Sequence, residues 1–220
     1  MKHLTAIAAI ALSIAASAYG QVGLGLKAGT LGAGVDLSVP VSADRFNVRL
    51  NGNYFSYSRS DEFSDINTDA KLKLNTIGLL ADWYPFKGSF RVTAGGYYNG
   101  NKIDVTGKPH GNGTYTFNNV SYTAQQVGTL TGKAELGSSV APYVGVGFGN
   151  SCGQSKRWSF IADFGVMFTG SPELTLNAYG PVASDATFRA NLEAERRKAQ
   201  DDVNTVSVYP VIALGVSYRF

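Results

Sequence analysis

The sequence predicts an all-β protein, an eight-stranded antiparallel up-and-down transmembrane β-barrel with short periplasmic turns and long extracellular loops. Three observations carry this prediction. The chain begins with an export signal. Stretches with a strict two-residue period then recur along it, each with an apolar face opposite a small or polar one. The connections between these stretches mostly alternate between short and long, as in barrels that insert from the periplasm.

Residues 1–18 have the pattern of a secretory signal peptide. A short polar start precedes the apolar run "LTAIAAIALSI", and the small residues before position 19 form a cleavage site. Cleavage after Ala18 leaves residues 19–220 as a single barrel domain, and cleavage after Gly20 is a close alternative. No later apolar run has the length of a spanning helix. We therefore expect export with a cleaved signal peptide and a location in the outer membrane of a Gram-negative bacterium.

The end of the chain, "YPVIALGVSYRF", shows the strand pattern most clearly. Apolar side chains occupy every second position: Ile212, Leu214, Val216, Tyr218 and Phe220. The residues between them are mostly small, with one charge at Arg219. A strand in a soluble protein buries its apolar face and shows charges to water, and this strand lacks such a charged face. The pattern predicts a strand whose apolar face contacts lipid and whose small face packs into a narrow lumen.

Eight segments follow this alternation, at about residues 21–29, 32–42, 45–59, 70–86, 89–105, 139–149, 157–178 and 206–220. Each is long enough for the ~9–11 residues that a tilted membrane strand needs. The fourth segment changes face, because Leu72 and Leu74 are at even positions whereas Ile77 and Leu79 are at odd ones. A bulge near Asn75-Thr76 would reconcile the halves, since one extra residue moves the following side chains to the other face.

Turn lengths and aromatic residues support the membrane interpretation. The joints "SADR", "FKGS" and "NSCGQSKR" are short, the first hairpin "AGTLG" is tight, and the remaining connections are long. Aromatic residues gather beside the short turns and the C-terminus, where ring side chains prefer the headgroup level: Phe46, Trp83, Tyr84, Phe86, Phe90, Trp158, Phe160, Tyr218 and Phe220. A soluble lipocalin-like barrel also alternates, but its outer face would need more charge than this chain carries.

Residue types argue against several other functions. A formal net charge of +3 is too small to suggest nucleic-acid binding. Beyond the signal peptide the one histidine is His110, in the long third loop, so no strand offers a histidine base to a lipid hydrolase. A carboxylate base or a loop-borne triad stays open. Cys152 is the single cysteine and reads as an unpaired turn thiol. We expect no enzyme, no catalytic residue, no metal and no cofactor.

The informative polar residues are the charges predicted to face the lumen: Lys27, Asp36, Arg49, Asp82, Arg91, Asp163 and Arg219. Ionisable groups at membrane depth are costly, so they face the interior and pair. These four cations and three anions nearly cancel. One interpretation is a salt-bridged plug, because eight strands leave barely enough room for side chains. The other is a polar path for a small zwitterionic or charged solute.

The last long connection contains "SDATFRANLEAERRKAQDDV". Its apolar residues recur near helical spacing, and Asp185 is placed to cap the start. We expect a short solvated helix at about 184–203 over the outer mouth. A lid, a lipopolysaccharide contact and simple loop packing are all open as its role.

The alternating strands and the closing "GVSYRF" resemble the small outer-membrane barrel superfamily that includes the OmpA transmembrane domain and OmpW. A closer resemblance is to the CarO-type, carbapenem-associated porins of ornithine uptake. It rests on "VGLGLKAGTLG", "VAPYVGVGF", "ADFGVMFTGSPELTL" and the charged helix before "YPVIALGVSYRF", which have counterparts in the same order. The resemblance implies a monomer whose terminal Tyr218 and Phe220 act as the signal for the barrel-assembly machinery. It also implies slow passage of small solutes, with basic amino acids as a candidate class.

The expected function is a narrow porin-like channel for small polar or charged solutes such as basic amino acids. One alternative is a non-conducting structural or surface-interaction barrel, and a less favoured one is an outer-membrane lipid hydrolase. The expected partners are outer-membrane lipids, lipopolysaccharide, the barrel-assembly machinery and small solutes, with no nucleic acid.

Overall fold

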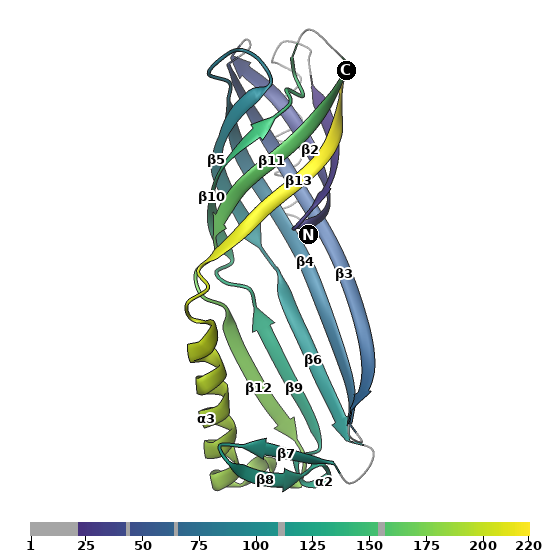
Figure 1. Cartoon of the computed structure of the whole chain (residues 1–220), viewed down its shortest axis with the longest axis vertical. Coiled ribbons are helices and arrows are strands. Elements are labelled where there is room, and N and C mark those ends of the chain that lie inside the picture. Colours follow the sequence, from purple (N-terminus) through teal and green to yellow (C-terminus); the bar gives the residue numbers. More distant parts are fainter. Residues whose placement is uncertain (1–21, 43–44, 64–65, 110–112, 154–156) are drawn as a thin grey trace, which may run out of the picture.

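The computed structural model describes residues 22–42, 45–63, 66–109, 113–153 and 157–220. The predicted signal peptide and His110 lie outside these residues. Within them, eight strands close into an antiparallel barrel, which confirms the predicted fold (Figure 1). In barrel order they are β1 (Gly23–Gly29), β2 (Gly32–Ser42), β3 (Phe46–Phe63), β4 (Ile66–Trp83), β5 (Phe90–Asn99), β10 (Val140–Phe148), β11 (Trp158–Phe168) and β13 (Val208–Arg219). No helix among the described residues is long and apolar enough to span a membrane.

Alternation along each strand separates a lipid-type outer face from the lumen. Leu26, Leu79 and Phe148 point outward and are more than half exposed, as an apolar face in lipid would be. The barrel has two ends, which we call the short-turn rim and the loop rim. The turns between β2 and β3, β4 and β5, and β10 and β11 make the short-turn rim, where the C-terminus also lies (Figure 1).

The sheet of the barrel continues beyond the loop rim. There β3 and β4 continue as one long hairpin, and β6 (Lys102–Pro109), β9 (Thr129–Glu135) and β12 (Glu173–Tyr179) join it in the order β3, β4, β6, β9, β12. A small hairpin of β7 (Thr114–Phe117) and β8 (Val120–Thr123), followed by α2 (Ala124–Val127), closes the far end (Figure 1). We call β6, β9, β12 and the outer halves of β3 and β4 the loop-side sheet.

Two predicted strands are wrong as single elements. The segment 89–105 divides into β5 and β6 at residues 100–101, although the pairing with β4 keeps one register there and Gly100 N–H still donates to Asn75 O at 2.8 Å. The segment 157–178 divides into β11 and β12 because the chain crosses at 169–172, where Gly170 N–H donates to Ser207 O. After β5 the chain keeps β4 as one neighbour and exchanges β10 for β9 as the other, whereas after β11 both neighbours change and β12 pairs with β9.

The predicted bulge near Asn75-Thr76 is wrong. Strand β4 pairs with β3 in one unbroken register from Ile66 to Trp83. Leu72 and Leu74 therefore share the inner face with Asp82. The surroundings change instead: within the barrel the inner face is polar and the outer face meets lipid, whereas in the loop-side sheet the inner face is the apolar one.

The predicted helix is α3 (Ala186–Val203), reached through the turn η1 (Pro181–Ser184). Asp185 caps it by accepting from Phe188 N–H at 2.8 Å. Phe188 and Leu192 pack against Phe117 and Val127 of the far end. The helix lies along β12 rather than across the barrel mouth (Figure 1), so its described contacts are those of loop packing.

The aromatic rim needs one correction. Trp158, Phe86 and Phe220 are well exposed at the short-turn rim, as predicted for a girdle. Tyr84 instead points into the barrel and is buried, where its hydroxyl accepts from Asn47 Nδ2 at 3.3 Å. Tyr84 lies one residue beyond the end of β4 but continues the alternation of that strand, so its side chain points inward as that of Asp82 does.

Candidate functional site

Six of the seven predicted lumen charges meet in one group, which we call the ion cluster. Each comes from a different strand, and each is at most 8% exposed. Its members are Lys27 on β1, Asp36 on β2, Arg49 on β3, Asp82 on β4, Arg91 on β5 and Asp163 on β11. Three cations and three anions give the cluster no net charge.

Asp163 is the centre of the ion cluster. Its carboxylate accepts two hydrogen bonds from Arg49, at 2.9 and 3.1 Å, and one from Arg91 Nη2 at 2.6 Å. Lys27 Nζ lies 3.3 Å from the same carboxylate. A carboxylate surrounded by three cations in a place without bulk water stays ionised, and it holds the cations in turn.

The other two carboxylates complete the arrangement. Asp36 lies 3.2 Å from both Lys27 Nζ and Arg49 Nη1. Asp82 lies 3.0 Å from Arg49 Nε and accepts from Thr93 Oγ1 at 2.6 Å. Arg49 therefore contacts all three carboxylates, so removing any one anion changes the balance of the whole cluster.

Register explains why these side chains meet. Asp82 is directly opposite Thr93 on β5, and Asn51 is directly opposite Asp36 on β2. Arg91 and Asp163 both pair with Gly147 of β10. A side chain at Gly147 would lie 2.8 Å from the Arg91 guanidinium carbon, so this glycine makes the space for the pair.

Arg219 is not part of the ion cluster, which corrects the predicted set. It pairs with Gly23 at the end of the β1–β13 ladder, while Lys27 lies four positions further along β1. Its guanidinium donates to Gly153 O at 2.6 Å in the turn between β10 and β11. Alternation gives the face of a residue but not its height in the barrel.

Polar residues that are not ionisable extend the site toward the loop rim. Asn51 Nδ2 donates to Asp36 at 2.7 Å, and Asn53 Nδ2 donates to Asn51 at 2.6 Å and to Thr76 Oγ1 at 2.8 Å. We call Asn51, Asn53 and Thr76 the asparagine ladder. The site prediction missed it because only ionisable residues were counted, although both asparagines share the inward phase of Arg49.

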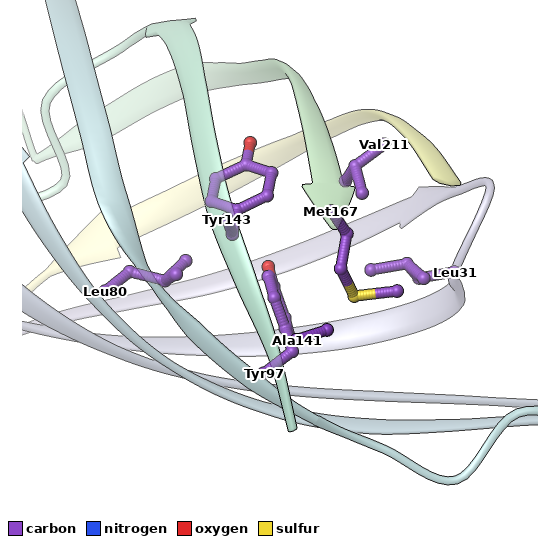
Figure 2. Packing of buried hydrophobic residues seen from close by; sticks show 7 residues of the cluster. All are labelled: Leu31, Leu80, Tyr97, Ala141, Tyr143, Met167 and Val211. Carbon is purple, nitrogen blue, oxygen red and sulfur yellow. The ribbon is translucent and has the colours of Figure 1, made fainter. Parts of the chain in front are cut away.

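The lumen also holds an apolar layer (Figure 2). Register relates it to the ladder, because Gly78 of β4 pairs with Asn51 on one side and with Tyr97 on the other. It lies toward the loop rim from the ion cluster, because Tyr97 follows Arg91 on β5 and Met167 follows Asp163 on β11. We call it the aromatic layer, and its members are Leu31, Leu80, Tyr97, Ala141, Tyr143, Met167 and Val211. All of them are at most 4% exposed.

The remaining predicted positions lie at the short-turn rim. Trp158 contacts Tyr218 and Tyr218 contacts Phe220, in each case edge to face with ring centroids 5.0 Å apart. Cys152 is buried in a turn, and burial raises the pKa of its thiol to about 12. The described residues hold no group of three or more residues suited to bind a metal ion.

No family model and no curated protein matches the chain. Among solved structures, CarO2 of Acinetobacter baumannii matches 91% of this chain and 98% of its own, at 22% identity and a TM-score of 0.58. CarO of the same organism matches 90% and 97%, at 25% identity and a TM-score of 0.57. The chain has the fold of the CarO barrels. This confirms the resemblance seen in the sequence and identifies the molecule as a small outer-membrane β-barrel.

A more distant match is a major outer membrane protein of Thermus thermophilus, with 13% identity over 92% of this chain and a TM-score of 0.46.

Proposed function

We propose that this barrel is a narrow porin-like channel for small charged solutes, with basic amino acids as the favoured class. The observation that carries the proposal is the neutral ion cluster in the lumen. A basic amino acid bears ammonium groups and a carboxylate, and the cluster presents both partners for them: Asp36 and Asp163 beside Lys27 and Arg91. A passing solute can exchange ion pairs with the cluster, its ammonium groups contacting the carboxylates and its carboxylate contacting the cations.

The second candidate is a non-conducting barrel with a structural or surface role. Burial of the whole ion cluster favours it, because narrow barrels are usually filled by their side chains. We propose no enzymatic role. The proposed partners are outer-membrane lipids, lipopolysaccharide and the assembly machinery, for a monomer.

Asp163→Asn tests the proposal, because it leaves three cations facing two anions. Liposomes with the wild-type protein should take up lysine faster than empty liposomes, and the variant should show a lower lysine-to-glutamate ratio. Breaking a buried pair also typically costs ~3–5 kcal/mol, so urea titration should show a less stable variant. Asp104→Asn is the matched control, since its pairs with Lys73 and Lys102 are partly exposed and such pairs contribute about 0–1 kcal/mol.

The outcomes separate the two candidates. Uptake equal to that of empty liposomes, together with the stability loss, would favour the non-conducting barrel. Uptake with an unchanged lysine-to-glutamate ratio would place the solute path away from the ion cluster.

A further inference from the structure

The lumen between the ion cluster and the loop rim has two unlike walls. One wall is the asparagine ladder on β3 and β4, whose hydrogen bonds lead without interruption from Thr76 to Asp36. The other is the aromatic layer, in which Tyr97 and Tyr143 are the largest side chains (Figure 2). A solute that travels between the loop rim and the ion cluster has to pass between these walls.

Tyr97 and Tyr143 meet edge to face, with ring centroids 5.4 Å apart. Glycines in the barrel wall make room for both rings. A side chain at Gly78 would lie 2.5 Å from a ring carbon of Tyr97. Side chains at Gly145 and Gly165 would overlap the hydroxyl of Tyr143. The two rings therefore lie in slots that only glycine leaves open.

The hydroxyl groups of these tyrosines are unusual. Each residue is 2% exposed, and no hydrogen bond among the described residues involves either hydroxyl. Neither oxygen is one of the fully buried polar atoms left without a partner, so both border open space inside the barrel, where a hydroxyl can bond to water or to a solute. Two such groups on one level of the lumen are hydrogen-bonding positions that the barrel itself does not use.

We infer that Tyr97 and Tyr143 form the gate of the channel, and that solutes cross this level along the asparagine ladder. The inference rests on the proposed function. When the rings are in their slots, the apolar layer excludes water and blocks ions, as hydrophobic constrictions do. A solute with several hydrogen-bonding groups contacts the ladder on one side and the free hydroxyls on the other. These contacts replace part of its hydration, whereas a simple inorganic ion gains less from them.

The test uses Tyr97→Ala and Tyr143→Ala, singly and together, in planar bilayers and in liposomes. The double variant should conduct potassium chloride several-fold better than wild type, and its lysine uptake should rise. Tyr98→Ala is the matched control, because the neighbouring side chain on the same strand faces lipid and is 55% exposed. Its conductance should equal that of wild type. Tyr97→Phe with Tyr143→Phe keeps the rings and removes the hydroxyls, so it should stay closed to salt but take up lysine more slowly.

A further variant tests the ladder. Asn53→Leu, added to the double alanine variant, should lower lysine uptake while salt conductance stays raised. Folding of each variant is checked by its altered gel migration before boiling, and only folded samples are compared.

The possible outcomes test the tyrosine gate and the proposed channel function separately. If wild type conducts lysine and the alanine variants behave like wild type, the gate is wrong and the channel stands. If wild type does not conduct and the double variant does, the gate is the barrier and the proposed function is wrong. If no variant conducts, the barrier lies elsewhere and the gate is overturned.

Discussion

At the scale of single residues, glycine decides how the lumen is filled. Gly147 leaves space for Arg91, and Gly145 and Gly165 leave space for Tyr143. A methyl group at Gly52, on the lipid-facing side of β3, would meet nothing within 4 Å. Glycines of one barrel therefore carry different constraints, and the constraint comes from the large side chain that lies beside the glycine in the lumen.

This difference predicts opposite effects of the same substitution. Gly165→Ala should destabilise the barrel by about 1–3 kcal/mol, because the added carbon overlaps the Tyr143 ring in a packed lumen. Gly52→Ala should be neutral or stabilise the barrel by up to about 1 kcal/mol, since glycine in a strand interior costs conformational entropy. Urea titration of both variants in lipid vesicles measures the difference. Equal losses of stability would show that the side chains around Tyr143 move to make room for the added carbon.

At the scale of elements, the two-residue period predicted the eight strands of the barrel and which face is polar, but not the strands β7, β8 and β9 of the third loop. It could not predict what lies against each face. Leu72 and Leu74 broke the lipid-facing pattern of β4 because the strand leaves the barrel there, and a bulge was the wrong explanation. Arg219 had the right phase and the wrong height for the same reason. Height along a barrel depends on cross-strand register, which no single strand contains.

Helix α3 carries a pH-dependent contact that can be measured. Hydrogen bonds from Arg196, at 2.8 and 2.9 Å, and from Arg197, at 2.9 Å, lower the pKa of Glu193 from 4.5 to about 2. A lowered pKa means that the ionised form is favoured in the folded helix. The contribution of these contacts is therefore fully present above pH 4.5 and is lost as the pH falls toward 2.

Carbon-13 NMR of the Glu193 carboxyl group should show the lowered pKa directly. The double variant Arg196→Ala and Arg197→Ala should return the titration to the ordinary range of glutamate, near 4.3. A wild-type Glu193 that already titrates in this range would mean that the arginines do not hold it in solution.

At the scale of the whole molecule, the outer face and the lumen of the barrel have opposite polarity. Its outer face is apolar along the strands and aromatic at the short-turn rim, as a lipid environment requires. Its lumen carries balanced charges, a polar wall and an apolar wall, and each is built from several strands. The ion cluster alone takes residues from six strands, so it forms only when the barrel closes. Closure of the barrel and assembly of the ion cluster therefore occur together.

We propose that Tyr218 and Phe220, near the end of the chain, act as the assembly signal on which closure in the cell depends. Phe220 is 70% exposed, and its N–H donates to Val22 O at 3.0 Å beyond the last ladder pair. Deleting Phe220 should lower the amount inserted in the outer membrane much more than Ser217→Ala does, since Ser217 is buried in the lumen. Unaided refolding of the same deletion variant into liposomes separates recognition from stability. If Phe220 is a signal, refolding stays near wild type while cellular insertion falls. A parallel fall in both would mean that Phe220 stabilises the barrel rim and that assembly reads another feature.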